Sequence, residues 1–339
     1  MPALKLRVAV EKYPLAAPFR ITGYVIEEMD VVLVELEDGP HRGRGEAAGV
    51  YYLGDDVDTM VAAIEANRKA IEAGIDRASL QRLLPAGGAR NALDCALWEL
   101  DAARNRTPAW KLAGLTSVQP LLTTMTLGAN EPAVMADGAR KYAQARALKL
   151  KLTGELDLDI ARIRAVRAAR PDVWMGVDAN QGYTIGVLRA LLDELVRADV
   201  KLLEQPLARG READLHGFSS PIPIAADESA LTLADVPGLV GRFQTVNIKL
   251  DKCGGLTEGL AMARKAHELG LGVMVGNMVG TSLAMAPAFV LGQLCDIVDL
   301  DGPIFLRHDR TPSVTYVDGK IHCSPDIWGS GATAPASSR

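Results

Sequence analysis

From residue 120 onward the chain carries short apolar, β-rich runs at a steady interval. They are PLLTTMTLG at 120, LKLKL at 148, WMGVDAN at 174, VKLLEQP at 200, PIAADES at 223, TVNIKLDKC at 245, GVMVGNM at 272 and IVDLDGP at 297. Successive starts differ by 28, 26, 26, 23, 22, 27 and 25 residues, which suits one strand, one helix and two short loops. The pattern therefore predicts eight strand–helix repeats.

The segments between these runs show helical periodicity. In ELDLDIARIRAVRAARP, the apolar residues Leu156, Ile160 and Ile163 fall at i, i+4 and i+7. In TEGLAMARKAHELG we expect a helix that starts at a capping Thr257 and ends at Gly270. Eight such repeats are typical of a closed parallel (β/α)-barrel. The alternative is a doubly wound open sheet, for which TLGANEP is a poor phosphate-binding loop after the first strand.

Residues 1–118 follow a different pattern. Two alternating stretches, LKLRVAV and EMDVVLVELEDG, predict a strand hairpin, and the helical segments VDTMVAAIEANRKAIEAG and ARNALDCALWELDAARN follow it. We expect an α+β capping domain of residues 1–118, joined by residues 305–330, and a barrel domain of residues 119–304. The polar end of the sequence predicts a disordered tail at 331–339.

Composition and charge narrow the possible partners. The 339 residues include 37 Lys or Arg and 42 Asp or Glu, with a formal net charge of −5 and no basic run, which argues against nucleic acid and membrane as partners. The five histidines lack ligand-like spacing, so we expect no histidine zinc site. The four cysteines form no C-x-x-C pair, and MPALKLRVAV lacks the apolar core of a secretion signal, which predicts free thiols in the cytoplasm.

Charged residues gather at the C-terminal ends of the predicted strands. They are Lys149 and Lys151 on the second strand, Asp178 on the third, Glu204 on the fourth, Asp227 on the fifth, Lys249 on the sixth, and Asp299 and Asp301 on the eighth. Residues two apart share a strand face, so the members of each pair should point the same way. Active sites of such barrels lie at this end of the strands.

Three acids on three consecutive strands predict a metal site. Like charges at close range repel strongly unless a cation lies between them. Carboxylate oxygens suit a hard ion such as Mg²⁺ or Mn²⁺. The structural alternative is a salt-bridge network between the acids and the lysines. Asn180, Gln205 and Glu228 lie beside the three acids in the sequence, and we expect them to orient the ligands.

The lysines indicate acid–base chemistry. A lysine near a divalent cation and a second lysine has its ammonium form disfavoured, so its pKa can fall toward a useful range. The cation would stabilise an enolate at a substrate carboxylate while a lysine removes the neighbouring carbon-bound proton. The second and sixth strands lie on opposite sides of the three acids, so their lysines would meet a flat enolate on opposite faces. We expect Lys149 to play a supporting part.

The motifs LKLKL, VDAN, LLEQP, ADES and NIKLDKCGG together resemble the muconate-lactonizing subgroup of the enolase superfamily, and the resemblance covers nearly the whole chain. This superfamily is known for a Lys or His base used together with magnesium. The resemblance implies one Mg²⁺ per subunit, with Mn²⁺ as a substitute, bound by Asp178, Glu204 and Asp227. It implies Lys151 and Lys249 as the acid/base pair and Lys149 as the lysine that touches the substrate carboxylate.

Within this subgroup, the D-x-D of VDLDGP resembles the dipeptide epimerases, whose acids hold the α-ammonium of the substrate. Asp299 and Asp301 match it. A cycloisomerase or succinylbenzoate synthase would bury two acids there without a cation to pair them, at a cost. The structural alternative is a helix-capping pair. The resemblance further implies substrate contacts from Thr126 and from Asn277 in GNMVGTS.

One position departs from the pattern. Members specific for alanyl-glutamate carry an arginine in a loop near the N-terminus. This chain reads PFRITGYV, with Tyr24 at that place and Arg20 at a different position of the loop. We therefore expect Tyr24 to contact the substrate and the second residue of the dipeptide to be apolar or otherwise different from glutamate.

The resemblance favours a dipeptide epimerase that inverts the α-carbon of the C-terminal residue by 1,1-proton transfer. The alternatives within the subgroup are a muconate cycloisomerase, an o-succinylbenzoate synthase and an N-acylamino acid racemase. A catalytically silent barrel that binds small peptides or acids is a further alternative, but it should have lost a lysine or a metal acid. We expect a small-molecule substrate, no nucleic-acid or membrane partner, and a homo-oligomer.

Overall fold

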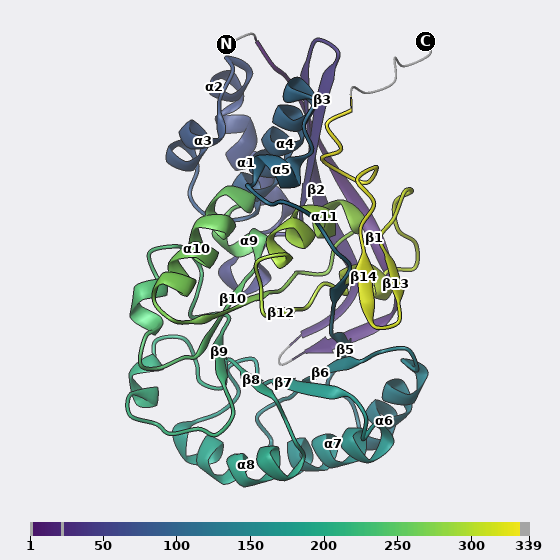
Figure 1. The fold of residues 1–339 in the computed structure, drawn as a ribbon, viewed down its shortest axis with the longest axis vertical. Coiled ribbons are helices and arrows are strands. Elements are labelled where there is room, and N and C mark those ends of the chain that lie inside the picture. The colour runs from purple at the N-terminus through teal and green to yellow at the C-terminus, as the bar shows by residue number, and fades with distance from the viewer. Residues whose placement is uncertain (1–2, 22–23, 333–339) are drawn as a thin grey trace.

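The computed structural model describes residues 3–21 and 24–332. Eight parallel strands form one curled sheet in the order β12-β11-β10-β9-β8-β7-β6-β5, with helices on its outside (Figure 1). The two edges meet through a backbone hydrogen bond from Thr124 N to Val298 O at 3.0 Å. This unbroken sequential order confirms the predicted barrel and excludes the doubly wound sheet, whose order would reverse. The strands are β5 (Met125–Leu127), β6 (Ala147–Lys151), β7 (Trp174–Asp178), β8 (Leu202–Glu204), β9 (Ile224–Ala226), β10 (Thr245–Ile248), β11 (Gly272–Val275) and β12 (Ile297–Val298).

The connections are less regular than eight repeats predict. The prediction of a helix after every strand is wrong after β8, β9 and β12, where only 3₁₀ turns follow. The first two of these repeats are the shortest, and Pro221, Pro223 and Pro237 lack the N–H that a helix interior needs. The helices are α6 (Pro132–Lys141), α7 (Leu156–Ala169), α8 (Ile185–Arg197), α9 (Leu250–Cys253), α10 (Leu256–Glu268) and α11 (Ser282–Gly292), and the 3₁₀ turns are η2 (Glu212–Leu215), η3 (Val236–Leu239) and η4 (Gly302–Phe305).

The start of α10 also differs from the prediction. The residue before the helix is Gly255, and Thr257 lies in its first turn. Thr257 N and Oγ1 both donate to Asp94 of the capping domain, at 2.9 and 2.6 Å. The prediction that Thr257 caps this helix is therefore wrong, because a carboxylate distant in sequence satisfies the free amide.

The N-terminal region is an antiparallel sheet covered by helices, as predicted. Helix α4 packs directly on β3, since a Cβ added at Gly43 would lie 2.0 Å from Ala96 O and one at Gly45 would lie 1.9 Å from Ala92 O. Only glycine permits this approach. The elements are β1 (Lys5–Ile21), β2 (Tyr24–Asp38), β3 (His41–Ala47), η1 (Tyr51–Leu53), α1 (Val57–Ala66), α2 (Arg68–Glu72), α3 (Arg77–Leu83), α4 (Gly88–Asn105) and α5 (Ala109–Leu112).

The C-terminal segment packs against the N-terminal region. Trp328 Nε1 donates to Arg44 O at 3.0 Å, and Arg44 Nη2 donates to Ile327 O at 2.7 Å. Strands β13 (Thr315–Val317) and β14 (Lys320–His322) form a small sheet with β4 (Leu121–Leu122). The run predicted as the first barrel strand is thus divided between β4 and β5. These contacts support the proposed capping domain of residues 1–118 joined by 305–330.

The long hairpin of β1 and β2 carries the capping domain to the mouth of the barrel (Figure 1). Arg20 O accepts a hydrogen bond from Ala129 N, just beyond β5, at 3.0 Å, and Leu15 forms a β-bridge with Leu306 beyond η4. From residue 333 onward the predicted tail lies outside the described residues. Among those residues, no helix has the length and apolarity that a membrane span requires.

Candidate active site

Three acids converge at the mouth of the barrel. Asp178 and Glu204 are the last residues of β7 and β8 and lie opposite each other in the parallel ladder, and Asp227 follows β9 directly. A carboxylate oxygen of each lies within 4.8 Å of the others, and all three side chains are buried. The barrel thus brings together the three acids that the sequence predicted as metal ligands.

The chemistry of this triad fits a hard cation. Glu204 Oε2 is buried and has no hydrogen-bond partner among the described residues. Burial, reinforced by the charge of Asp178, raises the pKa of Glu204 to about 7. A cation between the carboxylates would give Glu204 Oε2 a close partner and remove the repulsion. The triad could therefore hold a metal ion.

Two lysines flank the triad. Lys151 Nζ lies 2.5 Å from Asp178 Oδ2, and Lys249 Nζ lies 2.6 Å from Asp227 Oδ2. Lys151 ends β6 and Lys249 follows β10, so β7, β8 and β9 separate them. Both lysines nevertheless line the same cavity. They can approach one bound molecule from two sides.

Lys149 connects the triad with the last strand. Its Nζ forms an ion pair with Asp299 and lies 3.5 Å from Glu204 Oε2 and 3.9 Å from Asp178 Oδ2. Burial lowers the pKa of Lys149, but the carboxylates, Asp299 first, outweigh burial and hold this pKa above its ordinary value. Burial likewise lowers the pKa of Lys249, which the carboxylates, Asp227 first, raise well above its ordinary value. A lowered lysine pKa, as expected from the sequence, requires positive charge among the acids.

Lys252 belongs to the network but was not recognised from the sequence. It is buried, and its Nζ contacts Asp227 Oδ1 at 2.5 Å, Asp227 O at 2.6 Å and Asn247 O at 3.0 Å. Burial raises the pKa of Asp227, but Lys249 and Lys252 outweigh it and hold this pKa well below its ordinary value. The available signal was the second lysine of KLDK, which the short helix α9 turns back toward the triad.

Two of the three residues expected to orient the acids, Gln205 and Asn180, make hydrogen bonds to them. Gln205 Oε1 accepts from Asp227 N at 2.9 Å, and Asn180 N donates to Asp178 Oδ1 at 2.9 Å. Asn247, not singled out from the sequence, donates its Nδ2 to Glu204 Oε1 at 2.8 Å. Glu228 lines the cavity, and its Oε2 is buried without a hydrogen-bond partner among the described residues. Burial and the charge of Asp227 raise the pKa of Glu228 to about 8.

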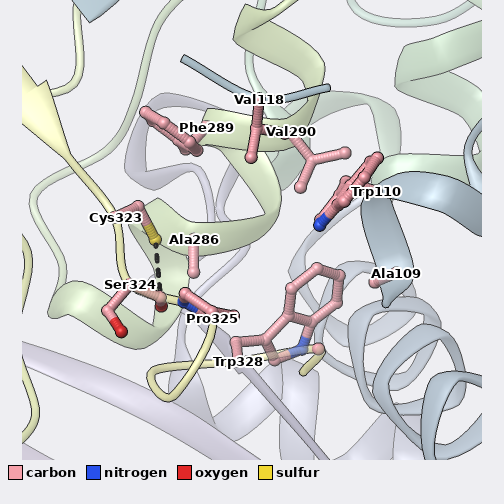
Figure 2. A pocket seen from close by; sticks show the side chains of 11 residues that line it. Ala109, Trp110, Val118, Ala286, Phe289, Val290, Cys323, Ser324, Pro325 and Trp328 are labelled. Carbon is pink, nitrogen blue, oxygen red and sulfur yellow. Dashed lines mark hydrogen bonds between the residues drawn. The ribbon is translucent and has the colours of Figure 1, made fainter. Parts of the chain in front are cut away.

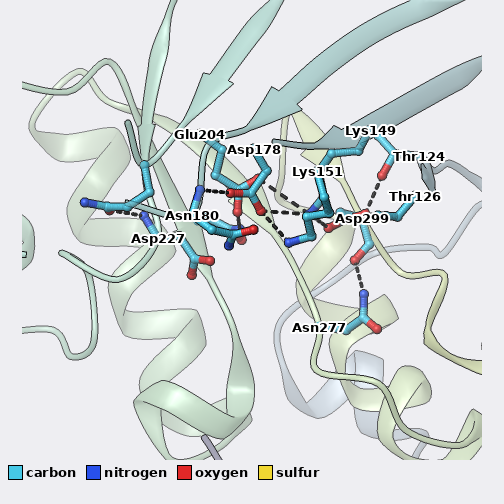
Figure 3. A network of polar contacts seen from close by, with 12 residues as sticks. Thr124, Thr126, Lys149, Lys151, Asp178, Asn180, Glu204, Asp227, Asn277 and Asp299 are labelled. Atoms are coloured by element: carbon cyan, nitrogen blue, oxygen red, sulfur yellow. Dashed lines mark hydrogen bonds and ion pairs between the residues drawn. The ribbon is translucent and has the colours of Figure 1, made fainter. Parts of the chain in front are cut away.

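A second polar group lies where β12 meets β5. Figure 3 shows Asp299 among Lys149, Thr124 and Asn277, on the side of Lys151 away from Asp227. Thr124 Oγ1 donates to Asp299, and Asn277 Nδ2 donates to Asp299 O at 2.5 Å.

Asp301 lies at the edge of the same group. Its Oδ2 accepts from Thr126 N at 2.6 Å. The residue precedes η4, yet its side chain makes no capping hydrogen bond to that turn, which disfavours the helix-capping alternative. Burial and the charge of Asp299 raise the pKa of Asp301 to about 6. A cation brought beside Asp301 would therefore be favoured.

The hairpin supplies the outer wall of the cavity, but not through Tyr24. That side chain is 48% exposed and does not line the cavity, although its ring packs on Tyr51 with centroids 4.6 Å apart. Tyr51 does line the cavity. So do five apolar residues that the sequence did not indicate: Phe19, Ile26, Met29, Met278 and Val279.

Another cavity lies between α5, α11 and the C-terminal segment (Figure 2). Trp110, Phe289 and Trp328 dominate its lining, which contains no charged residue. A site that moves protons needs ionisable groups in reach of the substrate. The acids and lysines at the barrel mouth meet that requirement, and this apolar cavity does not.

The chain is similar in sequence to known proteins over most of its length. Relatives include the L-Ala-D/L-Glu epimerase of Escherichia coli (strain K12), 39% identical over 94% of this chain and 99% of the relative. The N-acetyl-D-glutamate racemase of Pseudoalteromonas sp is 37% identical over 88% of this chain and 95% of the relative.

Solved structures that share the fold include the two that follow. An enolase family member from Agrobacterium tumefaciens, with homology to dipeptide epimerases and with bound sodium and L-Ala-L-Glu, is 37% identical, with a TM-score of 0.92 and coverage of 96% of this chain and 100% of the other. The dipeptide epimerase of Methylococcus capsulatus, complexed with Mg and L-Arg-D-Lys, is 30% identical, with a TM-score of 0.89 and coverage of 96% and 98%.

Two family models together span most of the chain. Residues 3–114 match the mandelate racemase / muconate lactonizing enzyme N-terminal domain, and residues 134–334 match the enolase C-terminal domain-like family. The site agrees with this assignment, because a triad of acids lies between lysines at the mouth of a barrel. The chain belongs to the enolase superfamily, among the relatives of mandelate racemase and muconate lactonizing enzyme.

Proposed function

We propose that the chain is a metal-dependent dipeptide epimerase that inverts the α-carbon of the C-terminal residue of its substrate. The observation that carries the proposal is the placement of Lys151 and Lys249. They come from opposite sides of the acidic triad and line one cavity. A carbon between them can lose a proton to one lysine and regain a proton from the other, which inverts its configuration.

The triad of Asp178, Glu204 and Asp227 would hold Mg²⁺, for which Mn²⁺ can substitute. This ion would bind the substrate carboxylate and stabilise the negative charge that develops there when the α-proton leaves. Its positive charge would also disfavour the ammonium form of both lysines, so that each can release a proton.

Lys151 then serves one face of the α-carbon and Lys249 the other, each as base for one epimer and as acid for its partner. In each turnover one lysine gains the α-proton and the opposite lysine gives one up, so the pair must be reset by exchange of protons with water. Lys149, held between Asp299 and the triad, would contact the substrate carboxylate.

The group around Asp299 and Asp301 would bind the amino-terminal residue. The carboxylate of Asp299 is already engaged by Lys149 and Thr124. Asp301 is therefore the better candidate for the α-ammonium of a dipeptide, with Thr126 and Asn277 lining the same region. A charge-assisted hydrogen bond of this kind is stronger than a neutral one.

A second candidate is an N-acylamino acid racemase, since the Pseudoalteromonas relative is named as one. An N-acyl substrate carries no ammonium, and Asp301 would then lack a cation to pair, because Lys149 is engaged by Asp299. This observation places the dipeptide first. We further propose a cytoplasmic location, in line with four cysteines that form no disulfide. We also propose a homo-oligomer.

The test is proton exchange at the α-carbon. The protein with Mg²⁺ would be incubated in D₂O with mixed L-Ala-L-Xaa dipeptides and, separately, with N-acetyl amino acids, and deuterium uptake would be read by mass. Exchange followed by the appearance of the L,D epimer supports the proposal. Exchange of N-acetyl amino acids alone would transfer the assignment to the racemase.

A further inference from the structure

The cavity has two walls of opposite character. The barrel wall carries the ionisable groups, including Lys151, Lys249 and Asp227. The wall opposite it is apolar and is formed by the ends of the hairpin strands and the loop after β11. We call this second wall the apolar cap, and it consists of Phe19, Ile26, Met29, Met278 and Val279.

The apolar cap is a packed unit. Phe19 of β1 pairs with Ile26 of β2 in the hairpin register. Both belong, with Met29 and Val279, to one apolar cluster built around Leu15 and Leu306. The ring of Phe19 also packs on Phe305 of η4, with centroids 4.6 Å apart. The cap is therefore held in place by contacts to the barrel.

The proposed reaction determines which part of the substrate meets this cap. The α-carbon has four substituents. The proton faces a lysine, the carboxylate lies at the acidic triad, and the peptide nitrogen leads to the amino-terminal residue near Asp301. Only the side chain remains, and the uncharged outer lining left for it is the apolar cap, with Tyr51 and Tyr52 beside it. Because the three heavy substituents stay close to one plane while the proton changes face, both epimers place this side chain against the same wall.

Among the residues that the structure describes, no cation is available there for an acidic side chain. The two lysines of the cavity are held by Asp178 and Asp227. The strand that carries Ile26 adds acids rather than bases, because residues 24–30 read YVIEEMD. Arg20 is exposed and lines a different cavity, between β1 and α6. A carboxylate buried against the cap would lose its hydration without a partner.

From these observations we infer that the epimerised residue carries an apolar side chain, aliphatic or aromatic, and that the apolar cap selects it. This inference rests on the proposed function and adds the substrate class. Glutamate should be rejected, although relatives of this chain are named for it or bind it.

The first experiment ranks substrates on the wild-type protein with Mg²⁺. The value of kcat/KM for epimerisation would be measured for L-Ala-L-Leu, L-Ala-L-Phe, L-Ala-L-Gln, L-Ala-L-Glu and L-Ala-L-Lys. We expect Leu or Phe to exceed Glu by about 100-fold or more, since a buried charge without a partner is penalised more than a missing methylene. Gln, which has the size of Glu without its charge, should fall between them.

The second experiment moves the preference. Ile26→Arg places a cation in the cap and should raise the kcat/KM ratio of Glu to Leu by at least about tenfold. Ile26→Leu keeps the cap apolar and should leave the ratio near its wild-type value. Val25→Arg adds the same charge one residue away, at a side chain that is 52% exposed and outside the cavity, and should not raise the ratio.

The outcomes are distinct. A wild type that prefers Glu overturns the inference and leaves the epimerase assignment intact. A preference for Lys also overturns the inference, and it would indicate that the acids of β2 bind the substrate side chain. A wild type that epimerises no dipeptide overturns both. The wild-type ranking decides the question even if Ile26→Arg fails to fold.

Discussion

The two walls of the cavity are built by different physical means. On the barrel wall, parallel pairing sets Lys151 opposite Asp178 and Asp178 opposite Glu204, so the strand ladder itself fixes the spacing of the charges. On the apolar cap, side chains of the hairpin and of the β11 loop meet through apolar contacts alone. Chemistry and selectivity therefore reside in separate parts of the molecule. We expect changes in the barrel wall to affect dipeptides alike whatever their C-terminal side chain, and changes in the cap to alter the ranking of these side chains.

Removal of the metal ion should produce the largest effect, and it should do so for every dipeptide. EDTA should lower kcat/KM by about 1,000-fold or more, and Mg²⁺ should restore it, because charge stabilisation worth several kcal/mol is lost. Glu204→Gln should show a similar loss of kcat/KM, because the amide oxygen can still accept from Asn247 but the side chain has lost the charge that binds the ion. Full turnover by the metal-free protein would refute the site assignment.

Asp301→Asn should produce a loss that depends on the amino terminus of the substrate. The asparagine oxygen can still accept from Thr126 N, so the fold should persist. A dipeptide with a free amino group should lose roughly 30- to 1,000-fold in kcat/KM, corresponding to about 2–4 kcal/mol. Its N-acetylated analogue should change little. Equal losses with both substrates would assign Asp301 a structural role.

The barrel end should also contribute to stability through the buried Lys252. Lys252→Met removes one of the two buried cations beside Asp227, together with three contacts, so the free energy of unfolding should fall by about 3 kcal/mol. The matched change Lys265→Met, at an exposed lysine of α10, should stay within about 0.5 kcal/mol. Chemical denaturation of both variants gives the comparison. Similar stabilities would show that the buried lysine is not part of the framework of the barrel wall.

The smallest predicted effect concerns Asp251, which joins the two domains by accepting from Ala48 N and Gly49 N at 3.0 and 3.1 Å. Burial, with Asp55 nearby, raises the pKa of Asp251 to about 7 in the folded protein. The folded state therefore binds this proton more tightly than the unfolded chain does. Its stabilising contribution is complete below the ordinary pKa of an aspartate and is lost as the pH rises toward 7.

Unfolding measured at pH 5 and pH 8 checks this. The wild type should lose about 1–3 kcal/mol more than Asp251→Asn over that range. The asparagine can accept the same two hydrogen bonds without titrating. An identical pH dependence in the two proteins would contradict the assignment.

The barrel wall could be predicted from the sequence because the positions of its charged residues follow from local features of each strand. A two-residue strand period and a charge at each strand end place the acids at one mouth. Lys252 was not predicted because its contact with Asp227 depends on the turn of the short helix α9. The apolar cap escaped for a related reason. Tyr24 and Ile26 share a strand face, but Tyr24 lies two residues nearer the tip of the hairpin, and only Ile26 lines the cavity. How far the hairpin reaches over the cavity depends on the packing of the capping domain on the barrel, which no sequence period reports.

The two-sided placement of Lys151 and Lys249 is the central claim, and isotope exchange tests it most directly. Lys151→Ala, Lys249→Ala and the surface control Lys265→Ala would each be incubated in D₂O with the L,L and the L,D form of one good substrate. Each site variant should lose epimerisation by at least about 100-fold yet still exchange the α-proton of one epimer, and the two variants should retain opposite epimers. Exchange of both epimers by either variant, or near wild-type epimerisation by both, would contradict the account.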